Sequence, residues 1–120
     1  YSVAQWRNAN IPPIALCNAK NVIPQNMMTK APTAELKPNQ KDQDTLPPYS
    51  QLDAILLRLN EQRLSVDEIV EQGFDAATVE RVARMLYAAE YKRRQSPPGV
   101  KITGMSFGRD RRYPITNGFK

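Results

Sequence analysis

The sequence predicts a mainly α chain, in which three short helices are accompanied by extended loops and a tail. Between Leu52 and Tyr91 the apolar residues recur every three or four positions, the spacing of one face of a helix. Helix-start signals at residues 65–68 and at Asp75 divide this stretch. No pair of alternating segments indicates paired strands. A short extended segment is predicted only at Leu16 or at residues 100–103.

The first 36 residues predict two short helical pieces. Residues 1–9 have the pattern of the end of a helix, which stops before the two prolines that follow Ile11. A helix of this length is too short to be stable alone, so we expect one that has been cut in its middle. Pro24 suits the first turn of a second helix, and Pro32 ends that turn region.

Residues 37–49 predict a long loop. The segment is polar, contains Asp42 and Asp44, and is interrupted by three prolines. Loops of this length usually have a function or are mobile. We therefore expect a loop that is functional or mobile here.

Residues 50–95 predict a helical subdomain. Ser50 is expected to cap the first helix, and Ser65 and Glu68 form a capping box that starts the second. Gly73 is the natural stop of that second helix. Asp75 is expected to cap the third and longest helix, which we extend to Lys92.

Positive charge is concentrated at the end of the chain. Residues 91–120 contain eight Lys and Arg against one acid, whereas residues 1–90 contain nine basic and eleven acidic residues. The net charge of +5 therefore comes from the last quarter of the chain. Such segregation favours contact with an anion over a role in solubility. Residues 96–120 are predicted to form a basic C-terminal docking tail.

The composition excludes several kinds of site. The chain has no histidine and a single cysteine, Cys17, so a Cys–His nucleophile and a histidine metal site are excluded. We expect Cys17 to pack in a core. One cysteine fits a reducing compartment, and no apolar run suggests a signal or a membrane span, so a cytoplasmic protein is expected. Because the chain starts at Tyr1, we expect a piece of a longer protein.

Several motifs together resemble the C-terminal part of bacterial NAD synthetases. Two of them, in the tail, look like the long, glutamine-dependent type. The resemblance covers nearly the whole chain in the family's order. The motifs are Pro32-Thr-Ala-Glu-Leu36, Gln40-Lys-Asp-Gln-Asp-Thr-Leu-Pro-Pro-Tyr49, Glu90-Tyr-Lys-Arg-Arg-Gln95, Pro97-Pro-Gly-Val-Lys-Ile-Thr103 and Phe107-Gly-Arg-Asp-Arg-Arg-Tyr-Pro-Ile-Thr-Asn117.

The resemblance implies a ligase that forms a C–N bond in NAD biosynthesis. In that family the carboxylate of deamido-NAD is adenylated by ATP, and glutamine-derived ammonia then displaces AMP. ATP and Mg²⁺ are co-substrates, and no prosthetic group is expected. The family's synthetase domain is a Rossmann-like, adenine-nucleotide-binding α/β fold that works as a dimer, and an N-terminal glutaminase domain supplies ammonia. By this resemblance, residues 1–36 would be the end of the α/β core, and residues 37–49 would be a mobile active-site loop.

The resemblance also assigns roles to residues. Lys92 matches a lysine that contacts deamido-NAD, and its neighbours Tyr91 and Arg93 are further substrate-binding candidates. Thr33 matches a threonine near the ATP phosphates. Three carboxylates of the same region are candidates to help hold Mg²⁺ between phosphates: Glu35, Asp42 and Asp44. The family's Ser-Gly-Gly-x-Asp-Ser loop for the ATP pyrophosphate is absent from these 120 residues, so the chain alone is expected to be inactive.

Two other interpretations stay open. The basic clusters also suit a small helical module that binds nucleic acid, although no recognised nucleic-acid-binding motif is present and the helices before Tyr91 are acidic. A protein-interaction module with no ligand is the other alternative. For Arg109, Arg111 and Arg112, docking to another domain or subunit is favoured over phosphate contact.

Overall fold

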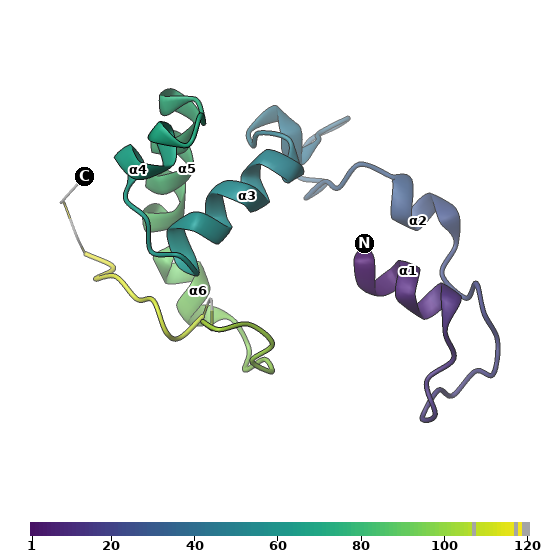
Figure 1. Cartoon of the computed structure of the whole chain (residues 1–120). Helices are drawn as coiled ribbons and strands as arrows, with labels where there is room; N and C mark the ends of the chain where they lie inside the picture. The colour runs from purple at the N-terminus through teal and green to yellow at the C-terminus, as the bar shows by residue number, and fades with distance from the viewer. Residues whose placement is uncertain (107, 117, 119–120) are drawn as a thin grey trace. The chain divides into compact units, whose positions relative to one another are not determined.

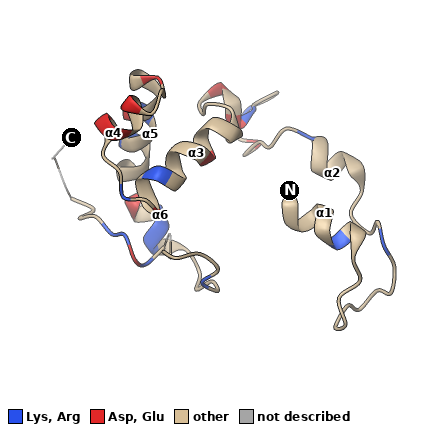
Figure 2. Cartoon of the chain, viewed as in Figure 1, with Lys and Arg blue, Asp and Glu red and all other residues tan. Residues whose placement is uncertain are grey.

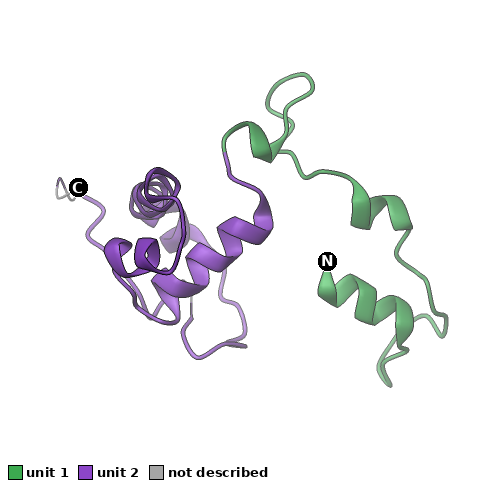
Figure 3. Ribbon diagram, turned by 45° about the horizontal axis from the view of Figure 1, so that its top comes forward, with its two compact units in different colours: residues 1–45 green, residues 46–120 purple. Residues whose placement is uncertain are grey.

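The computed structural model describes residues 1–106, 108–116 and 118. The chain divides into two compact units, Tyr1–Thr45 and Leu46–Lys120 (Figure 3). Helices are the only regular elements among the described residues, which confirms the mainly α prediction. None of the helices that the structure describes is long and apolar enough to cross a membrane. The predicted tail at 96–120 includes Phe107, Asn117, Phe119 and Lys120, which lie outside the described residues.

The first unit contains the helices α1 (Ser2–Ala9) and α2 (Gln25–Thr29) and a short 3-10 turn, η1 (Asp42–Asp44) (Figure 1). None of these elements contains a buried residue. Polar contacts hold the unit instead: the Asn8 side chain exchanges two hydrogen bonds of 2.9 Å with the backbone of Ile23, and the Arg7 guanidinium donates to three backbone carbonyls.

The prediction that Cys17 packs in a core is wrong, because Cys17 is exposed. Its neighbour Leu16 is fully exposed as well. The apolar residues of this loop do not recur at a helical or strand period, so no regular element turns them toward a common face.

The second unit contains α3 (Tyr49–Asn60), α4 (Val66–Glu71), α5 (Ala76–Ala88) and α6 (Glu90–Gln95). Helices α3, α4 and α5 pack on one another around a small apolar core (Figure 1). This core contains six positions of the predicted helical spacing, Ile55, Leu59, Ile69, Val79, Val82 and Leu86, together with Ala83.

Two of the three predicted helix starts in this unit are confirmed. The Ser65 hydroxyl accepts the Glu68 backbone N–H at 3.3 Å, and the Glu68 carboxylate accepts the Ser65 N–H at 2.7 Å. Asp75 accepts the N–H of Thr78 at 2.9 Å. Each bond satisfies a backbone donor that the first helical turn leaves without an intrahelical partner. Gly73, at φ +93°, follows α4 in the left-handed conformation expected of a helix stop.

Two helix boundaries differ from the prediction. Helix α3 starts two residues earlier, with Pro48 at the N-cap, so Ser50 lies inside the helix and does not cap it. Pro48 gives up no donor there, and its fixed φ suits the entry to a helix. The third predicted helix is two helices, because Ala89 at φ −85°, ψ 6° interrupts it. Lys92 therefore lies within α6 and does not end α5.

Candidate functional site

Helix α6 carries the three residues predicted to bind deamido-NAD. Tyr91 and Lys92 are exposed, and the Lys92 ammonium lies 5.9 Å from the centre of the Tyr91 ring, within the range of a cation–π contact. Arg93 is buried, so it lies on the opposite side of the short helix from solvent. The structure thus keeps the three residues on one element but in different environments.

A buried ion pair fixes the inner face of α6. The Arg93 guanidinium lies 3.0 Å from the Glu90 carboxylate, and only 5% and 1% of these two side chains is exposed. Arg94 adds a second contact to Glu90 at 3.3 Å. Glu90 was not among the predicted site residues, although a carboxylate three and four residues before two arginines is the spacing at which helix side chains meet.

The Glu90 carboxylate stays ionised in this environment. Burial by itself would raise its pKa, but Arg93, Arg94 and a hydrogen bond from the Tyr113 backbone together lower the pKa below its usual value. The charge is retained because each of these groups favours the anion. Glu90 therefore acts as a fixed negative anchor between α6 and the tail.

Tyr113 is the point at which the tail meets α5 and α6. Its carbonyl accepts a 2.7 Å hydrogen bond from Arg94, and its ring meets the Tyr87 ring edge to face at 4.4 Å between centres. The Arg111 side chain donates to the Tyr113 hydroxyl. Burial and the Tyr87 hydrogen bond raise the pKa of Tyr113 above its usual value of 10. The phenol is thus neutral at physiological pH.

The segment before Tyr113 forms a closed loop. Lys101 and Asp110 pair at 2.8 Å, and Asp110 also accepts the Ser106 N–H at 2.7 Å. These two donors are the main reason that the pKa of Asp110 is lowered. The loop is also tied to the connection between α3 and α4, since the Glu61 carboxylate accepts the Met105 N–H at 3.1 Å. The tail therefore folds back on the helices of its own unit.

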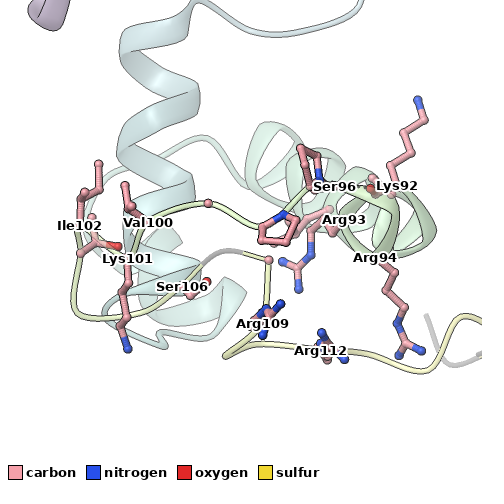
Figure 4. Close-up of a pocket in the computed structure, with 17 residues that line it drawn as sticks. Lys92, Arg93, Arg94, Ser96, Val100, Lys101, Ile102, Ser106, Arg109 and Arg112 are labelled. Carbon is pink, nitrogen blue, oxygen red and sulfur yellow. Dashed lines mark hydrogen bonds between the residues drawn. The ribbon is translucent and has the colours of Figure 1, made fainter.

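A cavity of about 560 Å³ lies between α6 and this loop (Figure 4). Six of its lining residues are basic and none is acidic. The cations also stand out in Figure 2, where blue ribbon marks α6 and the tail. Its basic lining residues are Lys92, Arg93, Arg94, Lys101, Arg109 and Arg112. A cavity lined by positive charges attracts anions.

The residues predicted to serve ATP and Mg²⁺ lie in the first unit. The Thr33 hydroxyl accepts the backbone N–H of Glu35 at 3.0 Å, which makes a tight turn with Glu35 at φ +54°. The Glu35 side chain is exposed and 3.5 Å from Lys30. The Asp44 carboxylate accepts the N–H of Lys41, the N-cap of η1, at 2.9 Å. The Asp42 N–H donates to the Pro32 carbonyl at 3.0 Å.

These carboxylates do not form a metal site by themselves. Within residues 1–106, 108–116 and 118, no three acidic, cysteine or histidine side chains lie close enough together to hold a metal ion. Thr33 and Glu35 instead line two adjoining hollows of about 500 and 570 Å³, with Lys30 as a shared basic neighbour. The hydroxyl of Thr33 and the ammonium of Lys30 are groups that can bind a phosphate.

The fold and the site together define a helical segment with a cation-lined cavity, and comparison with known proteins gives its family. The model of the family described as NAD synthase matches residues 11–96. The chain belongs to this NAD synthase family. Its relatives include the glutamine-dependent NAD(+) synthetases of Rhodobacter capsulatus, 49% identical over 120 residues, and Acinetobacter baylyi, 50% identical over 120 residues. All of this chain is covered, but only 22% and 21% of those enzymes.

A solved structure gives the same result. The glutamine-dependent NAD+ synthetase from Acinetobacter baumannii, determined with adenosine diphosphate, matches with a TM-score of 0.59 and 37% identity over 99% of this chain and 19% of that one. The chain thus spans about a fifth of the length of the relatives that it matches. The predicted family is confirmed, and the alternatives of a nucleic-acid-binding or protein-interaction module are not favoured.

Proposed function

We propose that this chain is the C-terminal part of the synthetase domain of a glutamine-dependent NAD synthetase. The observation that carries the proposal is the end-to-end match, at 49% and 50% identity, to enzymes of that name. The remainder of the synthetase domain would be a Rossmann-like α/β fold. Because the 120 residues contain only isolated glycines, the loop that cradles the ATP pyrophosphate would come from that remainder.

The proposed reaction converts a carboxylate into an amide in two steps. A carboxylate oxygen of deamido-NAD attacks the α-phosphorus of ATP, the bond to the β-phosphate breaks, and pyrophosphate leaves. The nitrogen of ammonia then attacks the acyl carbon, the C–O bond to AMP breaks as the C–N bond of NAD forms, and the nitrogen loses one proton to give the amide. The acyl-adenylate must be kept from water, which would otherwise hydrolyse it.

The residues of α6 would handle deamido-NAD. Lys92 presents an exposed ammonium, a compact charge suited to a phosphate or carboxylate, and the Tyr91 ring lies beside it. Arg93 would act from the buried side, where Glu90 fixes its position. The ion pair holds the orientation of α6 and hence of Lys92.

The first unit would serve ATP. Thr33, held in its turn by Glu35, would donate its hydroxyl hydrogen to a phosphate oxygen. Mg²⁺ would accompany ATP, held mainly by phosphate oxygens and water, as is usual for this ion. Because the described residues contain no cluster of three acidic, cysteine or histidine side chains, Glu35, Asp42 and Asp44 would only add to the ligands from phosphate and water. The loop at residues 37–49 would close over ATP and exclude water.

The proposal includes the assembly and the compartment. Ammonia would come from an N-terminal glutaminase domain, as the names of the relatives imply, and the enzyme would be a homo-oligomer, at least a dimer. The compartment would be the cytoplasm, where a single exposed cysteine stays reduced.

NAD formation tests this proposal directly. The protein that contains this chain is supplied with deamido-NAD, ATP, Mg²⁺ and glutamine, and NAD is measured by enzymatic cycling or chromatography. We expect glutamine-dependent NAD formation by the whole protein and none by the 120 residues alone. No NAD from the whole protein, with either glutamine or ammonia, would disprove the proposal.

A further inference from the structure

The cations that line the cavity between α6 and the tail are only partly neutralised. Two acids contact three of the six basic residues: Glu90 pairs with Arg93 and Arg94, and Asp110 pairs with Lys101. Six positive charges less two negative ones leave four. Within the described part of the chain, the guanidinium groups of Arg109 and Arg112 make no hydrogen bond or ion pair.

The Lys92 ammonium lies away from the tail segment that carries Arg109 and Arg112 (Figure 4). In Figure 4 the Lys92 side chain extends from α6 away from the tail, whereas Arg93 extends toward the loop that carries Arg109 and Arg112. The positive charge at the end of the chain therefore forms two groups. The inner group, Arg93, Arg109 and Arg112, faces the cavity, whereas Lys92 borders the cavity but extends its ammonium away from the tail.

The loop that carries the inner group is held in place before any ligand arrives. The Lys101–Asp110 pair closes it, the Glu61–Met105 bond ties it to the helices, and the Arg94–Tyr113 bond anchors the segment that follows. Like charges repel, so a fixed loop that keeps two arginines near Arg93 and Arg94 carries an electrostatic cost in the absence of an anion. That cost is removed when an anion binds.

The dimensions and walls of the cavity indicate the class of anion. About 560 Å³ is within the usual range of small-molecule sites and far exceeds the volume of one carboxylate. Apolar side chains such as Leu86 and Val100 line it beside the cations. Guanidinium forks match the paired oxygens of phosphates.

We propose that Arg109 and Arg112 form a second anion site that binds a diphosphate group, either the bridge of a dinucleotide or free pyrophosphate. The choice of these two ligands rests on the proposed function, which uses a dinucleotide and releases pyrophosphate. The positions of Arg109 and Arg112 beside the cavity do not depend on the proposed function.

Arginine labelling tests this site on the whole protein that contains the chain. Phenylglyoxal modifies accessible guanidinium groups, and peptide mass spectrometry gives the labelling rate of each arginine. Labelling is measured without ligand, with NAD and with inorganic pyrophosphate. Arg84, exposed on α5 and outside the cavity, is the internal control.

At ten times the dissociation constant, a bound ligand leaves about one site in eleven free, so labelling of Arg109 and Arg112 should slow about tenfold. Arg84 should label at an unchanged rate. Protection by NAD alone identifies a dinucleotide, protection by pyrophosphate alone identifies the free diphosphate, and both results support the site. In Arg112→Gln the protection of Arg109 should fall to about twofold at the same ligand concentration, because losing a charged hydrogen bond weakens binding about tenfold. Arg84→Gln should leave it unchanged.

Two results would overturn the proposal. One is equal labelling of Arg109 and Arg112 with and without either ligand. The other is two arginines that resist labelling even without ligand, which would mean that another part of the protein fills the cavity. Labelling requires no turnover, so either result is distinct from a failure to form NAD.

Discussion

Replacing Glu90 by glutamine (Glu90→Gln) tests whether the buried ion pair holds α6 and the tail. The amide keeps the size of the side chain but removes the negative charge between Arg93 and Arg94. The Arg93 side chain, of which 5% is exposed, would then keep its positive charge in a buried site without its anion. Burying an unpaired charge is among the most costly changes in a protein.

The magnitude follows from the geometry. Unit charges about 4 Å apart interact by about 4 kcal/mol at an effective dielectric constant of about 20. Mutations that remove one partner of a buried pair cost about 3–5 kcal/mol. The Arg94 contact adds less than about 1 kcal/mol, since 39% of its side chain is exposed. We expect Glu90→Gln to lower the free energy of unfolding by about 3 kcal/mol.

Urea unfolding of the 120-residue chain, followed by its helical circular dichroism, measures this change. Glu80→Gln, on an exposed position of α5, is the matched control and should stay within about 0.5 kcal/mol of wild type. Replacing Glu90 and Arg93 together by leucine should recover most of the loss, because no buried charge then lacks a partner. A Glu90→Gln protein as stable as the Glu80→Gln control would refute the reasoning.

Three further predictions concern the second unit. The pKa of Glu90 is lowered in the folded state, so its contribution to stability is complete above the unfolded pKa of about 4.3 and is lost as the pH falls through the folded pKa. The free energy of unfolding should therefore fall less steeply with acid in Glu90→Gln than in wild type. Parallel plots of unfolding free energy against pH for the two proteins would contradict this. Ser65→Ala removes the N-cap of α4 and should cost about 1 kcal/mol in urea unfolding, with Ser65→Asp retaining most of the stability; an equal loss in both variants would argue against capping. Ile69→Val should cost about 1 kcal/mol and Ile69→Ala about 3 kcal/mol, since this side chain is 0% exposed, and no difference between the two would exclude tight packing at this position.

The helical unit was predictable because its signals are local. The capping box at Ser65, the cap at Asp75 and the stop at Gly73 each depend on residues a few positions apart, and each appears in the structure. The break at Ala89 was not predictable in this way. Alanine favours the interior of a helix, so tertiary contacts, including the buried pair that starts at Glu90, decide where α5 ends.

The candidate site was predictable only in part, for a related reason. The charge count located the cations, and the resemblance singled out Lys92, but neither shows which way a side chain points. That Arg93 is buried and Lys92 exposed depends on which side of α6 faces the tail. The fold-back of the tail depends on Tyr113 and Glu61. Tyr113 lies within a motif of the resemblance but was given no role, and Glu61 lies in none of the motifs.

The most direct measurement of the proposed role of this chain is the steady-state kinetics of Lys92→Ala in the whole protein that contains it. Loss of a hydrogen bond to a charged group costs about 1.5–3 kcal/mol, so kcat/KM for deamido-NAD should fall about ten- to hundredfold. The KM for ATP should stay within about twofold of wild type, because Lys92 is assigned to the other substrate. A kcat/KM for deamido-NAD that does not change in Lys92→Ala would contradict the assignment of α6 to that substrate.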